Sequence, residues 1–307
     1  MTTTEATDPT APILPAQVER IAAAVKGRPE GDDAAVLAAA ISAAVGGDLM
    51  LLAIEPELPL VISEADCRQM HEETRTMLAT TRDSFAPGAR SCIDSDLSAA
   101  RGMKRLLARE HRQLVVCGSS RRGEDGQVLM GRTTRQLVEH EQCALAIAPR
   151  GLSSRGVLAI KRIAVGYDGT PEARAALSLA AAIAVGCGAR LTVGGVIDDR
   201  VPALGWPSLW IEPFRECWNE VMDGEVASLR KQIEAATAKL SVPVTVEVDR
   251  NIPSASLLDL SAAADLLVIG SRRWGPLARL VLGGTGEALT HGAWCSLLIV
   301  PRSDTGS

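Results

Sequence analysis

An internal repeat constrains this sequence more than any other feature. Residues 114–150 align with residues 266–302 without a gap. Identical aligned pairs include Gly118 and Gly270, Ser119 and Ser271, Arg121 and Arg273, Gly131 and Gly283, and Cys143 and Cys295. Agreement of this length indicates duplication, so the chain is expected to fold as two copies of one structural unit.

The beginnings of the two copies also match, with RIAAAVKGRPE from Arg20 and RIAVGYDGTPE from Arg162. The spacing differs slightly from that of the later match, so the second copy carries about ten extra residues in its middle. The basic, Gly- and Ser-rich segment 150–161 is typical of a linker. We therefore expect a first domain of residues 1–150 and a second of residues 151–307.

Short apolar segments alternate with helical segments along the second copy. Thr170 is a favourable N-cap, Pro171 suits the first helical position, and an Ala-rich helix then runs to the glycines at 186–188. A polar helix is expected at 219–240, and strands at 162–167, 189–198, 243–249, 265–270 and 296–301. Alternating strands and helices predict an α/β fold: two tandem doubly wound, Rossmann-like domains, each with a five-stranded parallel sheet flanked by helices.

Composition argues against several classes of protein. The net charge of −5 is the wrong sign for a general nucleic-acid binder. The N-terminal segment has neither a basic start nor an apolar core, and the Ala-rich runs are too short to span a membrane. Seven cysteines without CxxC spacing favour reduced thiols. We expect a cytoplasmic protein with neither nucleic acid nor membrane as a partner.

A ligand of a doubly wound sheet lies at the carboxyl ends of its strands. Asp168 follows the first strand of the second copy and could accept hydrogen bonds from an adenine amino group or a ribose. Gly283, Gly284 and Thr285 precede a helix, where free backbone amides attract phosphate. The alternative is that the glycines serve turn geometry alone and that Asp168 caps the following helix.

Two longer segments in the second copy, GYDGTPEA and VIGSRRWGPLARLVLGGTGEALTHGAWCSLLIVPR, resemble the universal stress protein family. The resemblance covers 162–302 and, more weakly, 94–150 of the first copy. It implies two five-stranded, doubly wound domains of the adenine nucleotide alpha hydrolase-like type. The nucleotide-binding branch of the family carries an early aspartate and the pattern G-x2-G-x9-G followed by Ser or Thr.

That pattern maps in part onto the second copy. Gly270 and Gly283 match, Arg273 stands at the second glycine, Gly284 replaces Ser or Thr, and Thr285 comes one position late. The arginine could crowd the phosphates or pair with them. The implied adenine-nucleotide site consists of Asp168, Gly169, Thr170, Val196, Gly270, Ser271, Arg272, Arg273, Gly283, Gly284, Thr285 and Gly286. The ligand would be ATP, with ADP or AMP as alternatives and Mg²⁺ as a companion.

The first copy departs further from the family pattern. Lys26 occupies the aspartate position and Arg28 replaces the small hydroxyl residue. Lysine has no acceptor for the hydrogen bonds that an aspartate could receive. We therefore expect the first copy to bind no nucleotide in the usual pose and to be mainly structural.

Three functions follow as hypotheses. The first is a stress-response regulator that binds an adenine nucleotide in its second domain and has no catalytic residues or metal ligands, slow ATP hydrolysis being left open. The second is a nucleotide-free module that binds an unknown protein partner. The third is a nucleotide-hydrolysing enzyme, for which no acid–base or nucleophile pair is visible.

Two further features concern partners. Trp206, Trp210, Phe214 and Trp218 gather in segment 200–218, which could pack on its own domain or form a lid or contact surface. The terminal strands of the copies, 145–149 and 296–301, are expected edges that could pair with each other. Such pairing would give an intramolecular pseudo-dimer, and a homodimer of chains is a further option.

Overall fold

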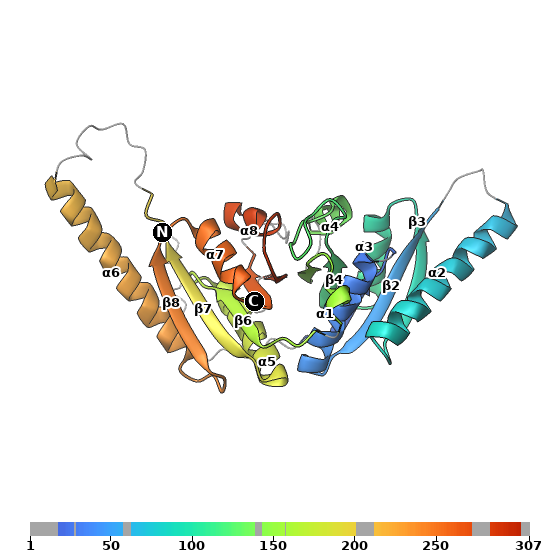
Figure 1. The fold of residues 1–307 in the computed structure, drawn as a ribbon, viewed down its shortest axis with the longest axis horizontal. Coiled ribbons are helices and arrows are strands. Elements are labelled where there is room, and N and C mark those ends of the chain that lie inside the picture. The colour runs from blue at the N-terminus through green and yellow to red at the C-terminus, as the bar shows by residue number, and fades with distance from the viewer. Residues whose placement is uncertain are drawn as a thin grey trace, which may run out of the picture.

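Two similar halves form one molecule in the computed structural model, which describes residues 18–27, 29–57, 63–138, 143–156, 158–200, 212–271 and 283–301 (Figure 1). The first half contains β1 (Arg20–Ala24), α1 (Glu30–Val45), β2 (Asp48–Pro56), α2 (Glu64–Phe85), β3 (Arg90–Asp96), α3 (Ala99–Arg109), β4 (Leu114–Gly118), α4 (Arg132–Val138) and β5 (Ala144–Ala148). The second half contains β6 (Arg162–Gly166), α5 (Pro171–Cys187), β7 (Arg190–Ile197), α6 (Glu212–Thr237), β8 (Val244–Arg250), α7 (Pro253–Ala262), β9 (Leu266–Gly270), α8 (Gly284–Leu289) and β10 (Ser296–Val300).

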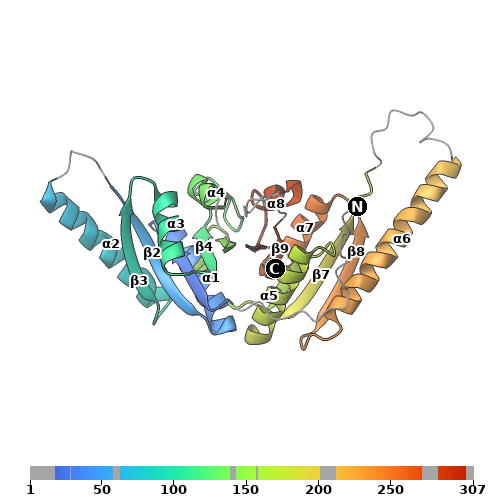
Figure 2. The same ribbon diagram turned by 180° about the vertical axis from the view of Figure 1, so that it is seen from behind.

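All ten strands belong to a single sheet, in the order β3-β2-β1-β4-β5-β10-β9-β6-β7-β8. Strands within each half are parallel, whereas β5 and β10 pair antiparallel, with Ile147 opposite Leu297. The two halves therefore extend as wings from a shared centre, as Figures 1 and 2 show from opposite sides. The expected pairing of the terminal strands within one chain is confirmed, and so are the five strands of each half.

Helices cover both faces of the sheet, as doubly wound domains require. α1 packs against α2 and α5 on one face, while α3 packs against α4, and α7 against α8, on the other. Neighbouring residues of β2 serve the two faces in turn, because Leu51 belongs to one core cluster and Leu52 to the other. Each cluster contains residues of both halves, so the apolar core is continuous across the centre of the molecule.

The start and end of α5 follow the sequence expectation. The Thr170 hydroxyl caps the helix by accepting the Ala173 amide at 3.2 Å, and Pro171 occupies the first turn. Gly188 ends the helix in the left-handed conformation, with φ of 66°. Cap and proline together fix the chain direction directly after β6, where a ligand site was expected.

Gly186 has a different function from the expected helix stop. It lies within α5, and a Cβ built on it would be 1.7 Å from the Ala44 carbonyl oxygen of α1. The two Ala-rich helices therefore cross with their backbones in contact. Glycine is required here because any side chain would force the halves apart.

The expected start of the polar helix at residue 219 was wrong, because α6 begins at Glu212. Pro213 is tolerated there since the first turn of a helix needs no amide from it. Trp206 and Trp210 lie outside the described residues, as does the side chain of Phe214. The Trp218 indole donates to Asp199 Oδ1 at 3.3 Å, beside the end of β7.

Two smaller features concern helix length and thiol burial. None of the helices in the described ranges is long and apolar enough to cross a membrane. Cys117, Cys143 and Cys295 are buried, and burial raises the pKa of the Cys117 thiol to about 11 and that of Cys295 to about 12. The thiols of Cys117 and Cys295 therefore stay protonated at neutral pH and act as packing groups.

Candidate functional site

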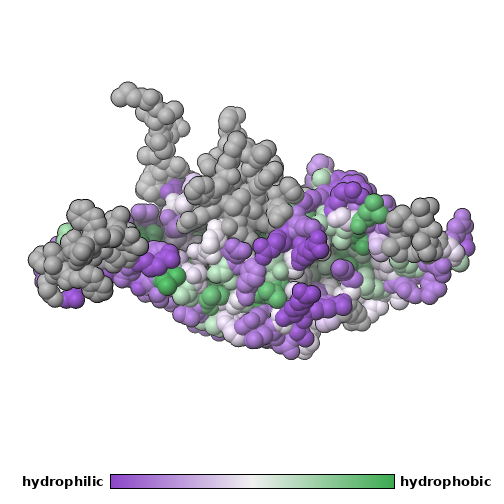
Figure 3. Space-filling view, turned by 90° about the horizontal axis from the view of Figure 1, so that it is seen from above, coloured by the Kyte–Doolittle hydropathy of each residue, from purple (hydrophilic) through white to green (hydrophobic). Residues whose placement is uncertain are grey.

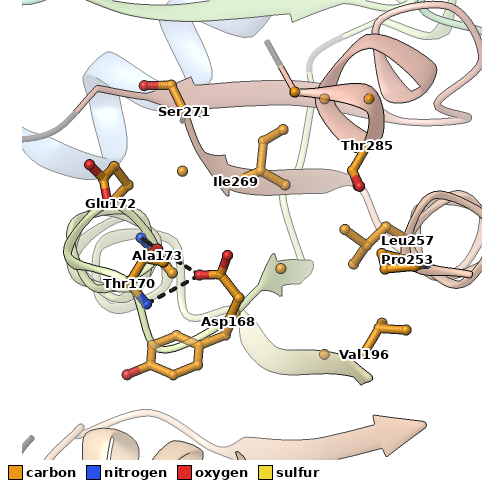
Figure 4. A pocket seen from close by; sticks show the side chains of 17 residues that line it. Asp168, Thr170, Glu172, Ala173, Val196, Pro253, Leu257, Ile269, Ser271 and Thr285 are labelled. Carbon is orange, nitrogen blue, oxygen red and sulfur yellow. Dashed lines mark hydrogen bonds between the residues drawn. The ribbon is translucent and has the colours of Figure 1, made fainter. Parts of the chain in front are cut away.

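The second half contains a pocket at the carboxyl ends of β6, β7 and β9 (Figure 4). β6 lies between β9 and β7, where the order of the strands reverses. This is the place where doubly wound sheets bind their ligands. Nine of the twelve expected site residues line the pocket, namely Asp168, Thr170, Val196, Gly270, Ser271, Gly283, Gly284, Thr285 and Gly286.

The other three expected site residues have different outcomes. Gly169 forms the turn between Asp168 and Thr170, with φ of 79°, and a Cβ there would lie 2.8 Å from Gln232 Oε1. It therefore shapes the turn and allows α6 to approach. Arg272 and Arg273 lie outside the described residues.

Asp168 makes hydrogen bonds within its own turn and also lines the pocket. Its Oδ1 accepts the Thr170 amide at 3.2 Å and the Thr170 hydroxyl at 2.6 Å, so the carboxylate stabilises the turn into α5. The same side chain lies on the wall of the pocket and points toward its interior (Figure 4). The Thr170 hydroxyl, in contrast, is committed to Asp168 and to the Ala173 amide.

Gly270 is required mainly by packing. A Cβ on it would lie 2.5 to 2.8 Å from backbone atoms of Glu172 and Ala173, at the start of α5. Gly118 has the same relation to Glu30 in the first half, at 2.1 Å from its carbonyl oxygen. The glycine shared by both copies therefore lets the strand end approach the first helix, whatever ligand binds.

Gly284 has a different environment. A Cβ on it would meet no described atom within 4 Å, so no neighbour in that part of the chain requires glycine. Thr285 follows it at the start of α8, and its hydroxyl points into the pocket (Figure 4). The pocket is therefore open beside the backbone of α8's first turn.

Ser271 brings a buried hydroxyl to the edge of the pocket. The residue is 2% exposed, and its Oγ has no hydrogen-bond partner among the described residues. Its equivalent in the first half, Ser119, donates to the Ala148 carbonyl at 2.9 Å and accepts the Leu129 amide at 3.2 Å. A buried hydroxyl without a partner is unfavourable, so a polar ligand atom at this place would be stabilised.

The described wall of the pocket carries two carboxylates, Asp168 and Glu172, and no lysine or arginine. Sequence reasoning missed Glu172, Gly194, Pro253 and Leu257 as lining residues. Gly194 could have been found, because it lies two residues before Val196 on the same face of β7. Pro253 and Leu257 come from α7, and only the packing of that helix brings them to the site.

An equivalent pocket in the first half lies at the carboxyl ends of β1, β2 and β4. Lys26 lies there in the place of Asp168, as the sequence alignment implied. Within the described ranges, no group of three or more His, Cys, Asp or Glu side chains is arranged to hold a metal ion.

Comparison with known proteins gives a consistent picture. The model of the Universal stress protein family matches twice, over residues 17–149 and 159–301. Universal stress protein Rv2005c of Mycobacterium tuberculosis is 27% identical over 194 residues, which cover 62% of each protein. A universal stress protein of Mycolicibacterium smegmatis is 28% identical over 144 residues, 46% of this chain and 48% of that protein. The chain thus spans less than two thirds of the length of these two relatives.

The fold has close counterparts among solved structures. A universal stress protein from Archaeoglobus fulgidus superposes with a TM-score of 0.65 at 16% identity, covering 94% of this chain and 98% of that one. The functionally unknown protein PA1789 from Pseudomonas aeruginosa gives a TM-score of 0.64 at 14% identity, covering 96% and 95%. At such low sequence identities, the comparison shows only that these proteins share the fold of the whole tandem chain.

Proposed function

Because the chain belongs to the universal stress protein family, with two tandem copies of its domain, we propose that it binds an adenine nucleotide in the second half and acts as a stress-response regulator. The observation that carries this proposal is the convergence of nine sequence-predicted residues on one pocket. Those residues come from the end of β6, from β7, from the end of β9 and from the start of α8. Separate segments that meet at a strand-order reversal are typical of a ligand site.

Asp168, Val196 and Leu257 would hold the adenosine. The Asp168 carboxylate is an acceptor suited to an adenine amino group or to ribose hydroxyls. Val196 and Leu257 supply apolar contact from β7 and α7, on the opposite side of the pocket (Figure 4). A purine needs both an acceptor at its edge and apolar contact on its faces.

The start of α8 would hold the phosphates. Gly283, Gly284 and Gly286 line the pocket with backbone only, and Thr285 adds a hydroxyl donor. No described atom lies within 4 Å of a Cβ position at Gly284, so the described residues leave room for a ligand to approach the main chain. ATP is the ligand that we propose, with ADP or AMP as alternatives and Mg²⁺ bound through the phosphates.

The remaining parts of the proposal concern the whole chain. We place the domains at 1–150 and 151–307, a division that the two ranges matched by the family model support. The protein would act in the cytoplasm through a protein partner, as a pseudo-dimer or as a homodimer of chains. It would regulate rather than catalyse, because the described pocket wall has no histidine or cysteine and the Thr170 hydroxyl beside Asp168 is held by the Ala173 amide in the cap of α5.

A nucleotide-free interaction module is the second candidate. The two carboxylates of the pocket favour it, because they oppose phosphate in the absence of a described cation. The hydrogen bonds of Asp168 within its own turn favour it as well. The same fold would then present its surfaces to another protein without a nucleotide.

Calorimetric titration of the full chain with ATP separates the two candidates. We expect Asp168→Ala to weaken ATP binding at least about tenfold, which corresponds to about 1.4 kcal/mol. Lys26→Ala is the matched control at the equivalent position of the first half, and it should leave the affinity unchanged. Asp168→Asn keeps an acceptor for the turn, so it separates loss of the carboxylate from loss of the turn.

Mass spectrometry of small molecules released on denaturation would identify a ligand that is retained through purification. Failure of the wild-type chain to bind ATP, ADP or AMP would leave the interaction module as the function. An equal loss of affinity in Asp168→Ala and Lys26→Ala would contradict a single site in the second half.

A further inference from the structure

We propose that the first half has a ligand site of its own, which takes an organic phosphate with an apolar body in place of a nucleotide. The site is the pocket at the carboxyl ends of β1, β2 and β4. Its position corresponds to the proposed nucleotide pocket, but several of the residues that line it differ in charge.

Among the described lining residues, the charge is inverted relative to the second-half pocket, whose Arg272 and Arg273 lie outside the described residues. Lys26 stands where the other pocket has Asp168, and Arg132 stands where it has Gly284. Arg121 and Arg122 also line the first-half pocket, and Glu30 is its one lining carboxylate. Four cationic groups against one carboxylate favour a ligand with two or more negative charges.

The loop that carries the arginines is held in place by many hydrogen bonds. The Ser120 amide donates to the Leu129 carbonyl at 2.8 Å, closing the loop between β4 and α4. Arg150 donates to the Arg121 carbonyl at 3.1 Å and to the Gly123 carbonyl at 2.7 Å. Arg121 Nε itself contacts Glu30 Oε1 at 2.8 Å. The backbone of the loop is therefore ordered before a ligand arrives, which lowers the entropic cost of binding.

The second half also supports this loop. The Val128 and Met130 amides donate to the Ala293 and Thr290 carbonyls, each at 2.8 Å. Because Thr290 and Ala293 follow α8, the anion-binding loop is attached to the half that carries the other pocket. A ligand in the first half would thus contact residues whose position depends on both halves.

The floor of the pocket is apolar. Leu52, Ile54, Met103 and Cys117 line it, and the raised pKa of the buried Cys117 thiol keeps it neutral. An organic phosphate with an aliphatic body would bury that body against this floor.

Calorimetric titration of the full chain with inorganic pyrophosphate tests the charge. We expect binding in the wild type that weakens as salt is raised, because the cations are exposed and screened. The double variant Lys26→Asp/Arg132→Gly gives the first half the two residues of the second, and it should lose at least about tenfold in affinity. Arg75→Ala removes an exposed cation of α2 outside the pocket and should change the affinity less than twofold.

Two outcomes would overturn the charge assignment. One is absence of pyrophosphate binding by the wild type at low salt. The other is unchanged affinity in Lys26→Asp/Arg132→Gly, with circular dichroism showing that the variant is folded. Neither outcome bears on ATP binding at Asp168, so the two sites fail independently.

A second titration tests the apolar floor. Butyl phosphate should bind the wild-type chain more tightly than methyl phosphate, because the longer chain buries more apolar surface. Ile54→Ala shortens a partly exposed side chain of the floor, so it should reduce that difference and leave pyrophosphate binding within about twofold. Equal affinity of the two esters for the wild type would overturn the assignment of an apolar body.

Discussion

At the scale of single residues, equivalent positions in the two halves serve as natural controls for each other. Ser119 and Ser271 align in sequence and both are buried. Ser119 joins the β4–α4 loop to β5 through its hydroxyl, whereas the Ser271 hydroxyl has no partner among the described residues. The serine hydroxyl is therefore expected to contribute differently to the free energy of unfolding at the two positions.

Alanine at these serines should have unequal effects on the free energy of unfolding. Ser119→Ala removes hydrogen bonds and leaves buried backbone groups unpaired, so we expect a loss of about 1 to 3 kcal/mol. Ser271→Ala removes an unpaired hydroxyl, so we expect a change within about 0.5 kcal/mol. Denaturant unfolding of both variants measures this, and equal losses would contradict the assigned environments.

Asp265 and Gln113 form another equivalent pair. Gln113 Oε1 accepts the amides of Glu19 and Arg20, and Asp265 Oδ2 accepts those of Lys161 and Arg162. Burial alone would raise the pKa of Asp265, but the hydrogen bonds from the Arg162 side chain and from the two amides together lower it. The second half thus uses a charged acceptor where the first uses a neutral one.

Because of this difference, we expect Asp265 to make the stability of the fold depend on pH. Since the pKa of Asp265 is lower in the folded chain, its ionised form stabilises the fold above the unfolded pKa of about 3.9, and that contribution is lost as pH falls through the folded pKa. Asp265→Asn should therefore be less stable than the wild type by about 1 to 2 kcal/mol at pH 7. The gap should shrink at pH 3, and a gap of constant size would contradict the charge argument.

At the scale of the elements, the α1–α5 crossing depends on one glycine. Gly186→Ala places a Cβ against the Ala44 carbonyl, so we expect a loss of about 1 to 3 kcal/mol in the free energy of unfolding. Gly224→Ala is the matched control, because Gly224 lies in α6 with nothing within 4 Å of its Cβ position. That variant should gain about 0.5 to 1 kcal/mol from helix propensity.

Destabilisation by Gly186→Ala together with stabilisation by Gly224→Ala would support the close crossing of α1 and α5. A Gly186→Ala variant as stable as the wild type would show that the crossing can relax at little cost. It would also mean that the two halves are less tightly fixed to each other than the helix contact implies.

Most elements were predictable because strong local signals coincide with the fold. Apolar strands such as β9 and β10 are buried on both faces, and the Thr170-Pro171 start and Gly188 end of α5 follow from known cap preferences. The start of α6 was missed because Pro213 and the neighbouring aromatics gave a misleading loop signal. Gly186 was misread because only a tertiary contact explains it.

Part of the candidate site was also predictable from local sequence signals. Strand ends and a glycine-rich helix start can be located from sequence, and these contribute Asp168, Val196 and Thr285. Residues from α7, such as Leu257, reach the pocket only through packing across the sheet. The sequence also could not show why position 270 is glycine. Close packing against the start of α5 and close approach of a ligand would both require glycine there.

At the scale of the whole molecule, the ten-stranded sheet joins both halves into one body. β5 and β10 lie at its centre, and Arg135 Nη2 contacts His291 Nε2 across the halves at 3.0 Å. On the face shown in Figure 3, apolar residues form small, separate spots among hydrophilic ones. On that face, the described residues therefore leave only small apolar areas exposed.

Shared core clusters predict that the two halves unfold together. All five tryptophans belong to the second half, namely Trp206, Trp210, Trp218, Trp274 and Trp294. Their fluorescence reports on that half alone, whereas far-ultraviolet circular dichroism reports on both. We expect the two signals to give coincident denaturation curves. A separate second transition in circular dichroism would mean that the halves are independent.

The central claim is that one half of the duplicated fold holds an adenine nucleotide and the other does not. A crystal structure of the full chain with a non-hydrolysable ATP analogue tests it most directly. The account predicts one analogue per chain, with its adenosine against Asp168 and Val196 and its phosphates beside Gly283 to Gly286. A second-half pocket that stays empty at saturating analogue, or a nucleotide bound at Lys26 instead, would contradict it.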